Sequence, residues 1–208
     1  MKAQRRLPNH VQRFDPDNIE WLKKPVIPVF SDPSGHEALL ANASVLFLQG
    51  IALPDLSGGL KQLDNPILAH TPVFVHIDLL EGLNADKAGL RYLSKFSQID
   101  GIITVRPYLI PLARQLGLKT VLRMFLQDSR AVERGVSVSN NQKPDAIELL
   151  PGVAAIEACN AFDALPVPRL AGGLIHSEQT VKRILASGCR SISTTDPKLW
   201  AMNLTCPP

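Results

Sequence analysis

Short apolar runs alternate along the chain with stretches in which apolar residues recur at helical spacing. Eight of these runs have the composition of strands, at Val26–Phe30, Val45–Gly50, Val73–Leu79, Gly101–Arg106, Thr120–Leu126, Ala146–Leu150, Arg169–Gly173 and Ser191–Thr195. Nearly all of them are apolar throughout, without the alternation expected when one face of a strand meets water. Parallel strands covered on both faces have this pattern. The runs therefore predict a parallel sheet with helices packed around it.

Helical spacing predicts helices between these strands, over Asp86–Ser97, Pro107–Leu116, Ser129–Asn140, Val153–Phe162 and Ser177–Ala186, and a short one over Pro197–Met202. Ser177 suits an N-cap, and Gly117 and Gly188 stand where helices should end. Pro54 and two nearby glycines oppose a helix after the second strand. Strand and helix thus alternate from residue 25 onward, as in repeated βαβ units.

Eight βα units within about 180 residues favour a compact architecture. We predict an α/β fold, a single (β/α)₈ barrel, with an open doubly wound sheet as the alternative. The 208 residues suffice for one well-packed core, whereas two full domains would be cramped. We therefore expect a barrel domain over residues 25–208, preceded by a basic N-terminal arm over residues 1–24.

Composition agrees with a folded protein and places its excess charge at one end. Hydrophobic residues make up 45% of the chain and charged residues 20%, which excludes a disordered protein. The net charge is +3, and residues 1–24 hold six basic against three acidic side chains. Such an arm could contact the phosphates of a nucleic acid; a solvated, frayed terminus is the alternative.

Cysteine usage and hydropathy bear on the cell compartment. Cys159, Cys189 and Cys206 form neither a CxxC pair nor a closely spaced Cys/His set, so neither a disulfide framework nor a structural zinc site is predicted. No apolar run approaches the ~20 residues that cross a bilayer, and the N-terminus lacks the apolar core of a signal peptide. We expect a cytoplasmic protein without membrane contact.

The third strand carries polar residues where a parallel α/β fold binds its ligands, at the carboxyl end. His76 and Asp78 close this strand, and the two-residue period of a strand puts them on the same face. Because both would be unfavourable if buried alone, they should face the barrel mouth or pair with each other. Glu81 follows in the loop, either as a ligand-facing residue or as a solvated helix-entry charge.

Arginines mark the fourth and fifth strands. Arg106 ends one, and Arg123 lies inside the other, where an arginine needs an anionic partner. Glu148 in the sixth strand is the candidate, and an internal ion pair is compatible with a ligand site. We expect Asp78 and Glu148 to face the same mouth, near Arg123. No cofactor is predicted; a divalent metal, if bound, would suit the oxygens of Asp78, Glu81 and Glu148.

A possible anion site lies at the ends of the last two strands. Gly172 and Gly173 end the seventh, and Ser193 and Thr194 end the eighth, just before the short helix. Glycines let backbone N–H groups approach a phosphate, and hydroxyls with a helix N-terminus complete such a cradle. Barrels commonly bind phosphate in the loops after these two strands. The four residues therefore predict phosphate binding, with an ordinary turn as the alternative.

Several longer motifs together resemble the glycerol uptake operon antiterminator family, namely Val75–Gly82, Asp86–Gly89, Asp100–Ile103, Glu148–Gly152 and Ala171–Ile175. The resemblance runs from about residue 25 to residue 202. It implies a bacterial cytoplasmic regulator that senses glycerol 3-phosphate and acts on the mRNA leader of glycerol-utilisation genes to prevent transcription termination. On this interpretation the barrel is a receptor, not an enzyme.

The resemblance also implies roles for individual residues. The phosphate would be held by Gly172, Gly173, Ser193 and Thr194, and the glycerol part would meet His76, Asp78, Glu81 and Glu148. The sequence departs from the family pattern at two pairs, with His176-Ser177 in place of Arg-Thr and Thr195-Asp196 in place of Ser-Asn. Asp196 puts negative charge beside the expected anion, although a helix N-terminus also favours an aspartate as its cap.

Two other functions remain open. A barrel enzyme acting on a phosphorylated small molecule, such as a lyase, isomerase or phosphodiesterase, could use His76, Asp78 and Glu148 as acid–base groups or metal ligands. A bare sensor could act through protein partners. The sequence has neither an RNA-recognition motif nor an aromatic stacking platform, so RNA binding rests on the resemblance. A homo-oligomer is compatible with the sequence.

Overall fold

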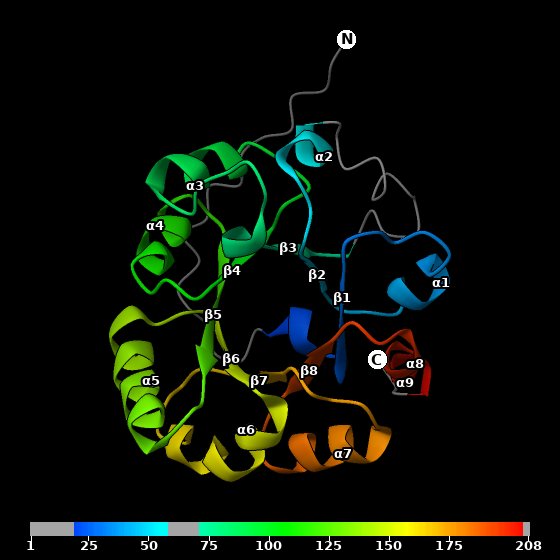
Figure 1. The fold of residues 1–208 in the computed structure, drawn as a ribbon, viewed down its shortest axis with the longest axis vertical. Coiled ribbons are helices and arrows are strands. Elements are labelled where there is room, and N and C mark those ends of the chain that lie inside the picture. The colour runs from blue at the N-terminus through cyan, green and yellow to red at the C-terminus, as the bar shows by residue number, and fades with distance from the viewer. Residues whose placement is uncertain (1–18, 58–70, 206–208) are drawn as a thin grey trace.

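The computed structural model describes residues 19–57 and 71–205, which form a closed barrel of eight parallel strands with helices around it (Figure 1). Each strand pairs with the next along the chain, and the barrel closes between the first strand and the last. The predicted (β/α)₈ barrel is therefore confirmed, and the open doubly wound sheet is excluded because its first and last strands would not pair.

All eight predicted strands are confirmed. They are β1 (Val26–Phe30), β2 (Leu46–Leu48), β3 (Val73–His76), β4 (Gly101–Thr104), β5 (Lys119–Phe125), β6 (Ala146–Leu150), β7 (Arg169–Gly172) and β8 (Ser191–Thr194). Most end one to three residues before the predicted end. Pairing stops where the polar residues begin, because those residues leave the sheet and form the loops of the mouth.

Helices follow the strands around the outside of the barrel, except the first, which precedes β1. They are η1 (Glu20–Leu22), α1 (Glu37–Leu40), α2 (Leu53–Ser57), η3 (Ile77–Leu79), α3 (Lys87–Leu93), α4 (Leu109–Gln115), α5 (Ser129–Gln142), α6 (Gly152–Ala158), η4 (Cys159–Phe162), α7 (Glu178–Ala186), α8 (Pro197–Trp200) and α9 (Met202–Thr205). Ser177 caps α7 as predicted, and Gly117 and Gly188 follow α4 and α7 with positive φ. In the described part of the chain, no helix is long and apolar enough to cross a membrane.

A short helix, α2, follows β2, although Pro54 and two nearby glycines had argued against a helix there. In α2, Pro54 is the second residue, so it falls in the first turn. Proline is tolerated there because the N–H groups of a first turn have no partner within the helix. The two glycines that also opposed this helix lie outside the described residues.

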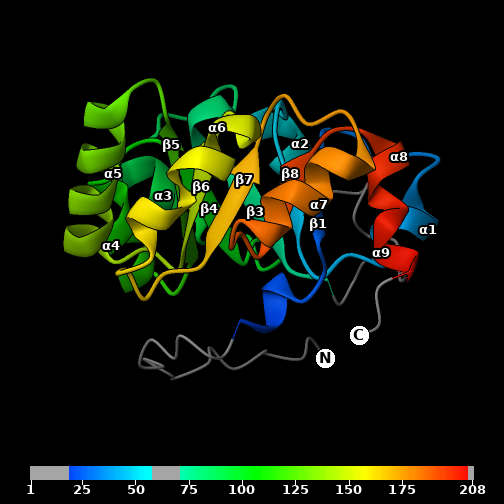
Figure 2. The same cartoon turned by 90° about the horizontal axis from the view of Figure 1, so that it is seen from below.

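The inside of the barrel is packed and is closed at the N-terminal ends of the strands. Trp21 packs on Phe74 with ring centroids 4.9 Å apart, and Phe47 stacks on the other side of the same cluster at 5.9 Å from Phe74. Figure 2 shows η1, which carries Trp21, beneath the barrel. In the described part of the chain, Trp21 and Leu22 fill this end, and the carboxyl ends of the strands are the end to search for a ligand site. The arm residues 1–18 lie outside the described residues.

Two buried cysteines lie in the layer between strands and helices. Cys159 and Cys189 are both free thiols, with their sulfur atoms 3.9 Å apart. Arg169 begins β7 nearby and binds Asp163 at 2.6 Å, so it ties strand to helix at the end away from the mouth. Cys206 lies outside the described residues. This region therefore serves packing, and the chemistry of interest lies at the other end of the barrel.

Candidate functional site

Two adjoining cavities open at the carboxyl ends of the strands. The smaller, of about 240 Å³, is lined by Val29, Gln49, Arg123, Leu150, Gly173, Leu174, Ile175, His176, Ser193, Thr194, Thr195 and Asp196. The larger, of about 650 Å³, is lined by Val29, Phe30, Ser31, Asp32, His36, Gln49, Gly50, Leu79, Glu81, Thr195, Pro197 and Trp200. Val29, Gln49 and Thr195 belong to both walls. The cavities are therefore neighbouring parts of one mouth.

The smaller cavity contains most of the predicted phosphate site. Gly173, Ser193 and Thr194 all line it. Gly173 has a φ of +76°, a conformation that residues with a side chain rarely adopt. It stands at the open edge of the cavity, where a backbone without a side chain leaves room for a ligand. These three predicted residues are thus brought together at the ends of β7 and β8.

Gly172 has a different position from the one predicted. It does not line either cavity, and a Cβ atom there would stand 2.9 Å from Oε1 of Glu148 and closer still to the Ser193 hydroxyl. Glycine is therefore required at residue 172 because the Ser193–Glu148 contact passes directly over its backbone. The residue supports the site from below, and a direct contact between Gly172 and a bound anion is not favoured.

A buried polar network lies under the smaller cavity. The Nε of Arg123 donates to Oε2 of Glu148 at 2.6 Å, and the Ser193 hydroxyl donates to Oε1 of the same carboxylate. Burial acts to raise the pKa of Glu148, but the charge and hydrogen bond of Arg123 outweigh it and hold the pKa below its usual value. Glu148 is therefore an ionised carboxylate with both oxygens bonded. The predicted Arg123–Glu148 ion pair is confirmed.

His76 completes this network as a neutral acceptor. Its Nε2 lies 2.9 Å from Nη2 of Arg123, and a guanidinium group can only donate, so Nε2 accepts and the ring proton is on Nδ1. Burial, followed by the charge of Arg123, lowers the pKa of His76 to about 4. Within the described ranges, nothing bonds the Nη1 group of Arg123, and Arg123 lines the smaller cavity. One edge of the guanidinium is therefore oriented by the network while another edge faces the mouth.

The neutral state of His76 predicts a pH dependence of stability. Between pH 6.5, its ordinary pKa, and pH 4, the unfolded chain binds a proton at this residue that the folded chain does not. The free energy of unfolding should therefore fall as the pH falls through this window, by up to about 3 kcal/mol from this group. Urea unfolding at a series of pH values measures the slope. His76→Gln should flatten it between pH 6.5 and 4, and an unchanged slope in this variant would contradict the assignment.

Asp78 does not join this network, which corrects the expectation that it faces Arg123 with Glu148. β3 ends at His76, and residues Ile77–Leu79 form the 3₁₀ turn η3. The two-residue period stops at the strand end, so the turn carries Asp78 away to the rim. There its Oδ2 accepts from the backbone N–H of Val105 at 2.8 Å, and its Oδ1 lies 3.1 Å from Nε of Arg106. The His76–Asp78 pair is likewise absent among the described contacts.

Arg106 and Glu81 take up separate places on the mouth. Arg106 is half-exposed on the rim, where it binds Asp78 and the Ala85 carbonyl. Glu81 lines the larger cavity, and its backbone bridges to Ala52 in the loop after β2. In the residues described, no group of three or more His, Cys, Asp or Glu side chains is arranged to hold a metal ion. Asp78, Glu81 and Glu148, which the sequence suggested as metal ligands, therefore lie in separate places on the mouth.

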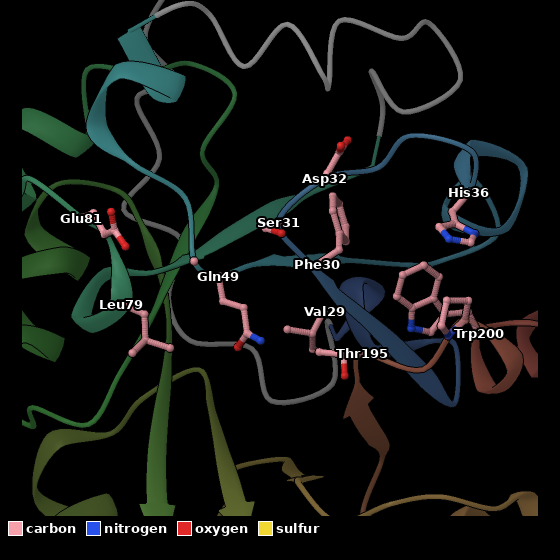
Figure 3. A pocket seen from close by; sticks show the side chains of 12 residues that line it. Val29, Phe30, Ser31, Asp32, His36, Gln49, Leu79, Glu81, Thr195 and Trp200 are labelled. Carbon is pink, nitrogen blue, oxygen red and sulfur yellow. The ribbon is translucent and has the colours of Figure 1, made fainter.

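The larger cavity has a wall that sequence reasoning missed. Figure 3 shows Gln49 near its middle, Glu81 on one side, and His36 with Trp200 on the other. The His36 and Trp200 rings meet edge to face at 5.5 Å. Gln49 directly follows β2, and Asp32 lies two residues after the end of β1, so the rule that polar residues after a strand mark the mouth would have found them.

The two departures from the family pattern have structural roles. Ser177 accepts from the N–H of Thr180 and caps α7. Asp196 accepts from the N–H of Lys198 at 2.9 Å and caps α8, as a helix N-terminus favours. The charge of Asp196 is thereby directed at the helix. The first turn of α8 is consequently engaged by its own cap, and it does not add a free amide to the predicted cradle.

Comparison with known proteins decides the family. The family model for the glycerol-3-phosphate responsive antiterminator matches residues 26–200. The chain belongs to the glycerol-3-phosphate responsive antiterminator family. The match covers the whole barrel and agrees with the motifs seen in the sequence. Because this family is regulatory, the barrel is not an enzyme.

Solved and curated relatives agree with this antiterminator assignment. A glycerol uptake operon antiterminator-related protein from Thermotoga maritima is 30% identical, with a TM-score of 0.74 over 85% of this chain and 98% of its own. The glycerol uptake operon antiterminator regulatory protein from Listeria monocytogenes is 28% identical, with a TM-score of 0.74 over 93% and 97%. The Escherichia coli K12 protein YgcP, itself uncharacterised, is 30% identical over 132 residues, covering 62% of this chain and 68% of its own.

Proposed function

We propose that this antiterminator binds glycerol 3-phosphate in the mouth of its barrel and, when loaded, acts on the mRNA leader of glycerol-utilisation genes. The single observation that carries the proposal is the smaller cavity at the ends of β7 and β8, where Gly173, Ser193 and Thr194 meet beside Arg123. Barrels commonly bind phosphate at this place. The family supplies the identity of the ligand and the kind of output.

The phosphate is assigned to the smaller cavity. Its 240 Å³ correspond to about eight water molecules at ~30 Å³ each, which is room for a phosphate group and the start of a short chain. The backbone at Gly173 and the free edge of Arg123 offer N–H donors there. Glu148 offsets the charge of Arg123 and fixes its direction, so the guanidinium is oriented before the ligand arrives. Fixed donors of this kind lower the entropic cost of binding.

The glycerol part is assigned to the wall shared with the larger cavity. Gln49 lies on both walls, and Glu81 and Asp32 line the larger cavity beyond it. Amide and carboxylate oxygens accept hydrogen bonds from hydroxyl groups, which is what a polyol requires. Of the mouth residues expected from the sequence, Glu81 can contact the glycerol directly. His76 and Glu148 act through Arg123, while Asp78 and Arg106 hold the rim together.

The same geometry argues against acid–base catalysis. Both oxygens of Glu148 are bonded, and neither Glu148 nor His76 lines either of the two cavities described above. A catalytic acid or base must come within hydrogen-bond reach of the proton that it transfers. A neutral His76 that accepts from Arg123 cannot take part without losing that bond. The network therefore supports a receptor that positions donors for an anion.

A titration of leader RNA with and without glycerol 3-phosphate tests the proposed switch. A ligand shifts a conformational equilibrium only through unequal affinity for its states, so loaded protein should bind the RNA about 5–150-fold more tightly. Coupling is reciprocal, so the RNA should tighten glycerol 3-phosphate binding by the same factor. Glycerol without phosphate is the control ligand and should leave the RNA affinity unchanged. Equal RNA affinity with and without glycerol 3-phosphate would eliminate the proposed switch.

The basic arm is tested in the same titrations. Deleting residues 1–18 removes four basic side chains but keeps Trp21 and Leu22, which are buried in the barrel. If the arm contacts RNA phosphates, this deletion should weaken RNA binding and flatten its salt dependence. The affinity for glycerol 3-phosphate should stay the same. An unchanged salt dependence would remove the arm from the RNA contact.

A further inference from the structure

Exposed apolar side chains gather along one part of the barrel rim. Six of them follow the carboxyl ends of five consecutive strands, β3 to β7: Leu79, Val105, Tyr108, Phe125, Val153 and Leu174. We call this set the apolar rim. In the described chain, only Tyr92 and Leu204 are large, exposed apolar residues elsewhere. Water-exposed apolar side chains are thus concentrated where the barrel opens.

The apolar rim follows neighbouring strands of the barrel as an arc. Figure 1 shows β3 to β7 following one another around the barrel, and neighbouring strands in a sheet lie about 4.8 Å apart. The ends of the arc reach the two cavities, because Leu79 lines the larger and Leu174 the smaller. The apolar rim over β3 to β7 therefore borders the cavities, and the smaller cavity extends beneath it to Arg123 and Leu150.

The arc is large enough for a stable protein contact. A ring side chain offers about 150–250 Å² and an aliphatic one about 60–120 Å², and the six are roughly half exposed, so together they present about 400 Å². Because only about 60% of an interface is apolar, an interface that contains this apolar area covers about 650 Å² in total on each partner. Stable protein–protein contacts bury about 800 Å² per partner and need about 500 Å². The apolar rim falls within this range.

Leu174 shows that the exposure has an energetic cost. It has a φ of +57°, in the left-handed region, and its side chain is 63% exposed. Leucine in this region costs about 1–2 kcal/mol, which asparagine or glycine would reduce or avoid. A strained backbone that directs an apolar side chain into water is an outlier of the kind found at binding sites.

Charge on the arc distinguishes a protein partner from a nucleic acid. Arg106 is paired with Asp78 on the rim, and Asp128 follows β5 as the cap of α5, just before Arg130. The arc therefore carries both signs, whereas a surface that binds RNA phosphates carries a single positive sign. A surface with both signs can match a second copy of itself across a two-fold axis. A positive residue of one copy then meets a negative residue of the other, and the same contact occurs again with the two copies exchanged.

We propose that the apolar rim is a two-fold interface through which a second copy of this chain binds, mouth edge to mouth edge. Phe125, 54% exposed at the end of β5, lies in the middle of the arc and is the expected anchor. The proposal does not depend on the identity of the small-molecule ligand. Its tests therefore use the protein alone, and their outcome is separate from that of the proposed function.

Sedimentation velocity of the full chain over a concentration series tests the interface. The wild-type protein should reach twice the mass of one chain. Phe125→Asp should raise the dimer dissociation constant by about 30-fold or more, as loss of a central aromatic anchor does. Val153→Asp should act in the same direction, and it should preserve the fold because an aspartate in the first turn of α6 suits the helix dipole. Circular dichroism verifies that each variant is folded.

Leu204→Asp is the matched control. Leu204 is 56% exposed, close to the value for Phe125, but it lies on α9 away from the apolar rim. It should leave the dimer unchanged. A wild-type chain that stays monomeric up to about 100 µM, or a dimer that survives both Phe125→Asp and Val153→Asp, would overturn the proposal. So would a monomer whose RNA affinity falls with Phe125→Asp, since the rim would then be an RNA surface.

Discussion

Replacing Glu148 with alanine should lower the free energy of unfolding by about 3–5 kcal/mol. Glu148 is fully buried and accepts from both Arg123 and Ser193. Without the carboxylate, the Arg123 guanidinium would keep its charge in a side chain that is only 14% exposed, with one edge open to the smaller cavity. The desolvation of an unpaired buried charge, more than the loss of the contact itself, produces the large effect. Urea unfolding at pH 7 measures it.

Two comparisons separate this explanation from a general loss of packing. Removing both charges at once, with Arg123→Met and Glu148→Leu, should restore much of the lost stability, because no unpaired charge remains. Glu178→Ala breaks the exposed pair with Lys182 on α7 and should change the stability little. Two results would contradict a strong contribution from the buried ion pair. One is a loss of less than about 1 kcal/mol of unfolding free energy in Glu148→Ala, and the other is a double variant that is no more stable than Glu148→Ala.

The fold was largely predictable because its strands are covered on both faces. A run such as Ala146–Leu150 is apolar throughout apart from Glu148, and its observed bounds equal the predicted ones. The ends of other strands were less predictable. Residues 77–79 alternate apolar, polar and apolar as a strand would, yet they form a 3₁₀ helix in which Ile77 is buried and Leu79 is exposed. Periodicity over three residues cannot tell such a turn from the end of a strand.

Parts of the site followed from single residues, and parts did not. Arg123 inside an apolar strand required an anion, which led directly to Glu148. The prediction for Asp78 used the two-residue period of a strand. It was wrong because β3 ends at His76, before Asp78. Gly172 and Gly173 are adjacent and chemically identical, so only the structure separates the residue under the Ser193–Glu148 contact from the one at the cavity. No single-residue signal distinguishes these two roles.

Two further features of the structure were not predicted from the sequence. Trp21 and Leu22 stand among basic residues and were assigned to the arm, although they close the barrel. An apolar pair next to the first strand is the signal that indicates this role. Tyr108 follows β4 and Phe125 ends β5, so their place on one rim is a product of the closed sheet and has no counterpart in sequence spacing.

The second large effect concerns the phosphate site itself. Gly173→Val should weaken glycerol 3-phosphate binding by at least about 100-fold, since two causes act together. A valine would project a branched side chain at the edge of the smaller cavity. It would also be forced out of the φ of +76° that brings this backbone to the cavity, because β-branched residues are strongly disfavoured there. The phosphate would thus lose both hydrogen-bond donors from the backbone and part of the space in the smaller cavity.

Gly117→Val is the matched control for backbone strain. Gly117 has a φ of +79°, and an added Cβ would meet nothing within 4 Å. It lies after α4, away from both cavities. The two variants should therefore lose similar amounts of stability from the same unfavourable conformation. Only Gly173→Val should lose the ligand, so the pair separates damage to the site from damage to the fold.

Isothermal titration of glycerol 3-phosphate into the wild-type chain and these two variants tests the central claim most directly, namely that the cavity at the ends of β7 and β8 holds the phosphate. The wild type and Gly117→Val should bind with equal affinity, and Gly173→Val, verified as folded, should give no measurable heat of binding. Wild-type affinity in folded Gly173→Val would contradict the claim and place the phosphate elsewhere on the mouth.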